Sequence, residues 1–125
     1  TYRKVVLPSD LWLRDQFQGE YGLHHCGVFD AYTEVYQPLK PSSLDLGPGT
    51  DLRKARKAYP DAKISTYIDV GALSKMSQTD IDALIAKMID DASPAELFTV
   101  ISVADAGPEI SDETVRSLMT IADRI

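Results

Sequence analysis

Short apolar segments alternate with helix-like segments along most of the 125-residue chain. Each apolar segment is bounded by residues that favour turns or helix ends, chiefly Gly, Pro, Ser and Asp. Alternation of this kind predicts right-handed βαβ units and a parallel sheet, and so an α/β fold. We expect strands at residues 21–25, 43–46, 63–68 and 97–103.

About five helices are expected around these four strands. The clearest helical signal begins at Ser77, where Asp80 takes the place of the usual Glu of a capping box. Apolar residues then repeat at helical spacing as far as Ile89. The other helices are expected at residues 9–18, 29–36, 51–59 and 111–125, and residues 69–76 are expected to be a loop. At this length, residues 1–125 form a single domain.

Two architectures fit this order of elements. One is a small doubly wound sheet of four strands. The other is half of a (β/α)8 barrel, because a whole barrel takes about 250 residues and this chain is half as long. In both architectures ligands bind at the carboxyl ends of the parallel strands.

Residues 22–27 place two histidines directly before the only cysteine of the chain. Residues two apart in a strand point to the same face, so His24 and Cys26 can converge while His25 faces away. An imidazole and a thiolate that meet in this way form half of a metal site, most naturally for zinc. The alternative is that Cys26 is a small buried apolar residue beside ordinary histidines.

Charge and composition exclude some classes of function. The chain carries 19 acidic and 13 basic residues, a net charge of −6, which argues against binding nucleic acid. Its apolar runs are too short to cross a membrane. A single cysteine excludes an internal disulfide and fits a reducing cytoplasm.

A glycine-rich turn, Gly47-Pro48-Gly49, follows the second expected strand and suggests an alternative function. It looks like the first motif of S-adenosylmethionine-dependent methyltransferases, where glycines let the cofactor approach the backbone. Asp69, after the third strand, could then bind the ribose hydroxyls, by the logic of dinucleotide folds. Asp51 stands where a third glycine would be expected, and a rigid βα turn also accounts for this sequence.

The segment Leu23-His24-His25-Cys26-Gly27 resembles the His-x-Cys-Gly segment of the uroporphyrinogen decarboxylase superfamily. The similarity is to the branch of corrinoid- and zinc-linked methyltransferases. It continues, in the same order, through residues 44–47, 50–52, 55–56, 59–62, 68–69, 73, 77–89, 100–108, 112–113 and 115.

This resemblance implies that the chain is the carboxyl-terminal half of a TIM-barrel-like (β/α)8 enzyme. In that branch zinc is held by His-x-Cys and a downstream Cys, and the enzyme moves a methyl group between a corrinoid and a thiol-type acceptor. His24 and Cys26 would be two zinc ligands, and Asp45 and Asp69 would line the substrate site. This chain has no second Cys. Either Asp105 completes the zinc shell, or the metal site is degenerate, or the remaining ligand lies on the missing half of the barrel.

The resemblance also bears on partners. The substrate would be a small molecule or a corrinoid protein, and in the decarboxylase branch it would be a tetrapyrrole acid. Half a barrel has two open sheet edges, so we expect self-association or pairing with an amino-terminal half-barrel. The start at Thr1 rather than Met hints at a longer protein. A non-catalytic βα association module is the alternative.

Overall fold

Four strands form the centre of the computed structural model, which describes residues 2–103, 108, 110–113 and 116. They are β1 (Gly22–His25), β2 (Ser43–Leu46), β3 (Lys63–Ile68) and β4 (Phe98–Val103). The strands lie side by side in sequence order, and each neighbouring pair is parallel. The predicted α/β fold with a parallel sheet is confirmed, whereas the described residues form an open sheet and do not show a barrel.

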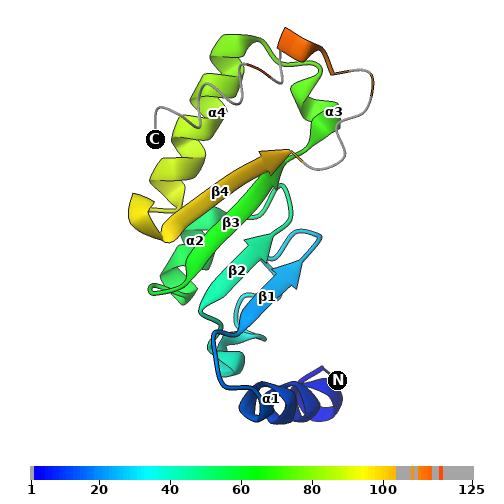
Figure 1. Cartoon of the computed structure of the whole chain (residues 1–125), viewed down its shortest axis with the longest axis vertical. Helices are drawn as coiled ribbons and strands as arrows, with labels where there is room; N and C mark the ends of the chain where they lie inside the picture. Colours follow the sequence, from blue (N-terminus) through cyan, green and yellow to red (C-terminus); the bar gives the residue numbers. More distant parts are fainter. Residues whose placement is uncertain (1, 104–107, 109, 114–115, 117–125) are drawn as a thin grey trace.

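The helices are α1 (Leu7–Gln16), α2 (Leu52–Ala58), α3 (Val70–Leu73) and α4 (Gln78–Asp91). A π-helical turn (Tyr2–Val6) precedes α1, and short 3-10 helices lie at Gln37–Leu39 and Ala95–Leu97. Figure 1 shows α1 at the end of the sheet where the strands begin. No helix in the described part of the chain has the length and apolar character needed to cross a bilayer.

Local capping explains where two of these helices begin. The carboxylate of Asp51 accepts a hydrogen bond of 2.9 Å from the backbone N–H of Lys54 at the start of α2. At α4, Ser77 and Asp80 form the predicted capping box. Both contacts satisfy backbone donors that the first turn of a helix leaves without partners.

The helix predicted at residues 29–36 is wrong, because this segment is a series of turns. Its backbone bonds are mostly of the three-residue type, from Tyr32 to Phe29 and from Val35 to Tyr32. The hydroxyl of Thr33 also reaches the carbonyl oxygens of Phe29 and Asp30, so a side chain competes with the backbone ladder. Aromatic and β-branched residues have low helix propensity, which removes the local drive for a helix.

Two other predictions on helices have different outcomes. The predicted loop at residues 69–76 contains the short helix α3, whose first turn is capped by the carboxylate of Asp69 through the N–H of Ala72. Of the helix predicted at residues 111–125, the structure describes only residues 111–113 and 116. Most of that prediction therefore lies outside the described residues.

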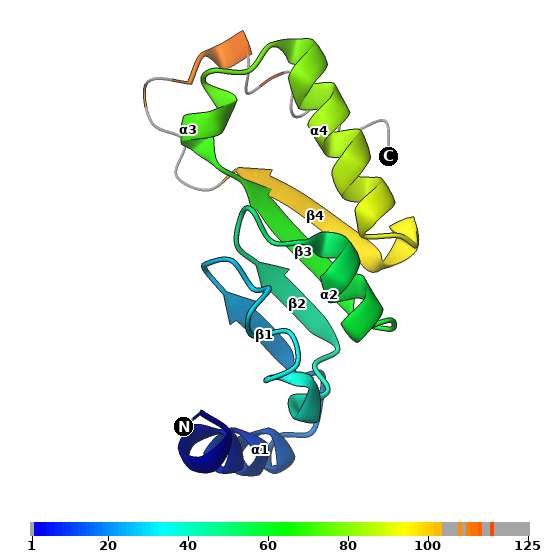
Figure 2. The ribbon, with the colours of Figure 1, turned by 180° about the vertical axis from the view of Figure 1, so that it is seen from behind.

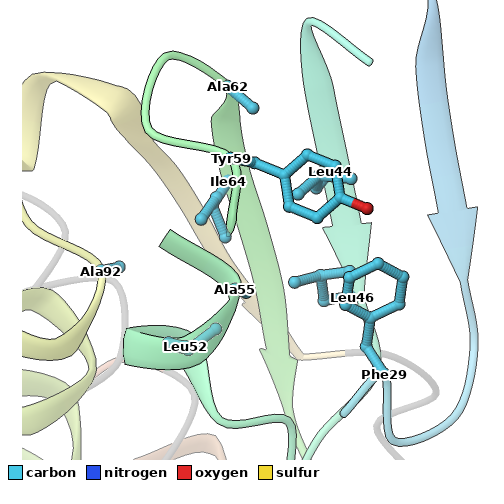
Figure 3. Packing of buried hydrophobic residues seen from close by; sticks show 9 residues of the cluster. All are labelled: Phe29, Leu44, Leu46, Leu52, Ala55, Tyr59, Ala62, Ile64 and Ala92. Carbon is cyan, nitrogen blue, oxygen red and sulfur yellow. The ribbon is translucent and has the colours of Figure 1, made fainter. Parts of the chain in front are cut away.

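One face of the sheet packs against the helices and forms the core. Alternation along β2 and β3 directs Leu44, Leu46 and Ile64 toward α2, and all three are almost completely buried. Figure 3 shows these side chains packed with others from α2 and from the loop after β1. The remaining members of the cluster are Phe29, Leu52, Ala55, Tyr59, Ala62 and Ala92.

The other face of the sheet carries polar side chains, and no helix among the described residues covers it (Figure 1). The same alternation places His24, Asp45, Ser65 and Tyr67 on it. Figure 1 looks onto this face, and Figure 2 shows α2 in front of the opposite one. We call it the open face. Parallel sheets are normally covered on both faces, so a polar face without a covering helix is unusual.

Candidate functional site

His24 and Cys26 meet at the carboxyl end of β1. The Nε2 atom of His24 lies 2.9 Å from the Sγ atom of Cys26. Cys26 is exposed, so the alternative that it is a buried apolar residue is wrong. The His24 side chain is 55% exposed, so both side chains of the pair lie at the surface.

The carboxylate of Asp45 contacts the other ring nitrogen of His24, Nδ1. Its Oδ2 atom lies 2.7 Å from Nδ1 of His24, and the two residues are directly opposite each other in the pairing of β1 with β2. The hydroxyl of Ser65 in turn donates a hydrogen bond of 2.9 Å to Oδ1 of Asp45. We call His24, Asp45 and Ser65 the polar row, because each comes from a neighbouring strand at the same level of the sheet.

The backbone around Cys26 is fixed from two neighbouring strands. The hydroxyl of Tyr67, on β3, donates a hydrogen bond of 2.8 Å to the carbonyl oxygen of Cys26. The N–H of Gly47, just after β2, donates one of 2.8 Å to the carbonyl of His25. Cys26 therefore lies in a turn whose backbone is held in place by these two hydrogen bonds.

His25 points to the opposite side of the sheet, as the two-residue period of a strand predicts. Its ring packs against three aromatic rings at centroid distances of 4.9–6.2 Å, from Tyr32, Phe29 and Tyr36. This separation gives the two adjacent histidines different environments. His25 belongs to the packing of the loop after β1, whereas His24 belongs to the open face.

The donor set of this site suits zinc in part. An imidazole nitrogen and a thiol sulfur are typical zinc ligands, and a carboxylate on the second ring nitrogen is typical of a metal-binding histidine. Among the residues that the structure describes, no group of three or more His, Cys, Asp or Glu side chains is placed to hold a metal ion. The predicted third ligand, Asp105, lies outside the described residues.

The two aspartates predicted to line a substrate site have different surroundings. Asp45 belongs to the polar row, where both carboxylate oxygens are within hydrogen-bond distance of a neighbouring side chain. Asp69 lines a groove of about 690 Å³ between α2 and α4. We call this the α2–α4 groove, and it also includes Gly49, Asp51 and Lys87.

The local backbone structure requires glycine at both Gly47 and Gly49. A Cβ atom at Gly47 would lie 2.1 Å from the carbonyl oxygen of Cys26, so only glycine fits there. Gly49 has a φ of +81°, a conformation that side chains disfavour. The turn therefore needs glycine at both positions whether or not a cofactor binds.

Sequence reasoning missed Ser65 and Tyr67. The available signal was the alternation along β3, where polar Ser65 and Tyr67 flank buried Thr66 between buried Ile64 and Ile68. Reading that signal required knowing which strand lies next to which and in what register.

Comparisons of the chain with protein-family models, with curated proteins and with solved structures find no match. The function must therefore be inferred from the residues of the open face and their geometry. The central features of this geometry are the 2.9 Å approach of His24 to Cys26 and the carboxylate of Asp45 behind the imidazole.

Proposed function

We propose that this chain is the carboxyl-terminal half of a uroporphyrinogen decarboxylase-like barrel enzyme, close to the corrinoid- and zinc-linked methyltransferases. The convergence of His24 and Cys26 at the carboxyl end of a parallel strand is the observation that carries the proposal. The strand order supports it, because a (β/α)8 barrel is built from parallel strands in sequence order, with the helices on the outer face of the sheet and the inner face turned away from them.

In this function His24 and Cys26 contribute two zinc ligands, and Asp45 orients the imidazole. Zinc bound there would lower the pKa of a substrate thiol, so that the thiolate exists at neutral pH. A third ligand comes from Asp105 or from another part of the barrel. The methyl group would pass between a corrinoid, free or bound to its own protein, and a thiol-type acceptor.

Metal binding tests the site directly. Purified protein, with Cys26 kept reduced, should bind zinc, and cobalt in its place should give the near-ultraviolet absorption of a cobalt–thiolate bond. Cys26→Ala should abolish this absorption, and His24→Ala should weaken metal binding at least about tenfold. His25→Ala is the matched control, because it removes the adjacent imidazole that faces the other side of the sheet.

The result that would overturn the metal role is equally clear. It is the absence of both zinc binding and a cobalt–thiolate band in folded wild-type protein with a reduced thiol. Loss of binding in His25→Ala, with the fold intact by circular dichroism, would also contradict the assignment of ligands.

A second candidate function is S-adenosylmethionine-dependent methyl transfer. It is favoured by the α2–α4 groove, because Gly49 and Asp69, which that motif would use, both line this groove. Calorimetry with S-adenosylmethionine separates the two candidates. Binding that is lost in Asp69→Ala and kept in Cys26→Ala would support this second function, and the absence of any heat of binding would end it.

A further inference from the structure

We infer that Asp45 and Ser65 are positioning residues that set the tautomer of His24. The sequence alone suggested a substrate-binding role for Asp45. The polar row points instead to a chain of hydrogen bonds that starts at Ser65, passes through Asp45 and ends on the imidazole. As far as it concerns metal binding, this inference rests on the proposed function, whereas the tautomer itself does not.

The backbone register of the sheet brings these groups together. His24 is the direct partner of Asp45 in the pairing of β1 with β2, and Asp45 is the direct partner of Ser65 in the pairing of β2 with β3. Side chains at paired positions leave the sheet in the same direction, about 5 Å from each other. The row is therefore built into the strands rather than into flexible loops.

Each oxygen of Asp45 has one partner within this row. Oδ1 accepts the hydroxyl proton of Ser65 at 2.9 Å, and Oδ2 lies 2.7 Å from Nδ1 of His24. An ionised carboxylate can only accept hydrogen bonds. The proton of the neutral imidazole must therefore reside on Nδ1, and the bond from Ser65 holds the carboxylate in the orientation that receives it.

The consequence appears at the other ring nitrogen. With the proton on Nδ1, the lone pair of Nε2 faces the Sγ atom of Cys26 at 2.9 Å. That lone pair can accept a hydrogen bond from the thiol when no metal is bound, or it can bind a metal beside the sulfur. In proteins the partner of one histidine nitrogen commonly decides the role of the other in this way.

Nitrogen-15 NMR of the imidazole rings tests the inference, because it reports directly which nitrogen carries the proton. In metal-free protein above neutral pH, His24 should be in the Nδ1–H form. Asp45→Ala should shift His24 toward the Nε2–H form that free imidazole side chains prefer. Ser65→Ala should give a smaller shift in the same direction, and Ser65→Thr should restore the wild-type spectrum. His25 is the internal control, and its signals should stay in place in all three variants.

Metal affinity provides the second measurement. If the positioning is functional, Asp45→Ala should weaken zinc binding by about 10- to 100-fold while Cys26 remains available. An unchanged tautomer in both Asp45→Ala and Ser65→Ala would overturn the inference, even if zinc binds. The expected tautomers in a protein that binds no zinc would leave the positioning role standing and remove the proposed function. The backbone amide spectrum of each variant shows whether it is folded.

Discussion

Gly47 lies against the backbone of Cys26 more closely than any residue with a side chain could. A Cβ atom at Gly47 would lie 2.1 Å from the carbonyl oxygen of Cys26 and 2.5 Å from its carbonyl carbon. The neighbouring atoms belong to the backbone, so no rotation of a side chain can relieve the overlap. The loop after β1 therefore keeps its position because the loop after β2 has a glycine at this point.

Gly47→Ala should consequently destabilise the protein and displace Cys26. We expect a loss of about 1–3 kcal/mol in the free energy of unfolding, measured by urea denaturation, because the backbone of one loop must move. Gly27→Ala is the matched control, since a Cβ atom there would have its nearest neighbour at 3.9 Å, an ordinary contact. Equal stability of the two variants would contradict this account of the loop.

A second prediction concerns Arg56, a buried cation on α2. Its guanidinium donates hydrogen bonds to carbonyl oxygens on three separate segments, those of Ala62 at 2.6 Å, Ala92 at 2.9 Å and Leu97 at 3.1 Å. Arg56→Met removes the donors and leaves these carbonyls without partners, so we expect about 3 kcal/mol of destabilisation in urea unfolding.

The control for Arg56 is Arg53→Met on the same helix. Arg53 is exposed and pairs with Asp90 and Asp91 at the end of α4. The guanidinium of Arg53 is exposed and Asp91 keeps its second partner, Lys87, so this variant should lose less than about 1 kcal/mol. A similar loss in both variants would show that charge, rather than the buried hydrogen bonds, is responsible.

The third prediction is that ionisation of Tyr59 makes the free energy of unfolding depend on pH. Burial is the main cause that raises the pKa of Tyr59 to about 12, from an ordinary value of about 10. The folded state therefore keeps this proton after the unfolded state has lost it, so the stabilisation is complete below about pH 10 and disappears as the pH rises toward 12. The free energy of unfolding of the wild type should fall across this window.

Tyr59→Phe should show a smaller fall over the same pH range, because this variant has no phenol to ionise at that position. It should also be less stable at neutral pH by about 1 kcal/mol, since the hydroxyl donates a hydrogen bond to the carbonyl of Thr33. Tyr32→Phe, which removes an exposed phenol, is the control for the substitution itself and should be as stable as the wild type at neutral pH. An unchanged slope in Tyr59→Phe would show that Tyr59 does not couple ionisation to unfolding.

Association is the fourth prediction. The outer edges of β1 and β4 are open in the described sheet, and no described helix covers the open face (Figure 1). We expect self-association, or pairing with an amino-terminal half-barrel when one is supplied, because unpaired strand edges invite further strands. Sedimentation over a range of protein concentrations should show a species larger than the monomer. A monomer at all concentrations would contradict self-association through these edges.

A variant of α1 separates two possible interfaces. Trp12 on α1 and Phe17 just after it are 64% and 71% exposed, so they are alternative apolar contacts for association. Replacing both by Gln should leave the association unchanged if the sheet mediates it. Dissociation of this double variant would locate the contact on α1 instead.

Local signals in the sequence predicted most of the elements, because their causes are local. The capping residues Ser77 and Asp80 and the β-branched composition of residues 63–68 act within a few positions of the chain. The apolar spacing of residues 29–36 predicts a helix. This prediction is wrong because the Thr33 side chain bonds the nearby backbone and the ring of Phe29 is buried in the core.

The site was only partly predictable for a different reason. The convergence of His24 with Cys26 follows from the two-residue period of a single strand. The contact of Asp45 with His24 depends on how β1 and β2 are paired, which no single segment encodes. Zinc, the corrinoid and the ligand role of Asp105 remain predictions.

The polar row also limits how this site can change during evolution. Its three members lie at paired positions of three strands, and each side chain points to the open face because side chains alternate along a strand. One residue added within β2 would move the side chains that follow it to the opposite face of the sheet. Asp45 would then turn in among the helices, while Leu44 would be exposed to water. Substitutions can diversify the chemistry of this face, but insertions or deletions inside its strands would destroy the site and the core together.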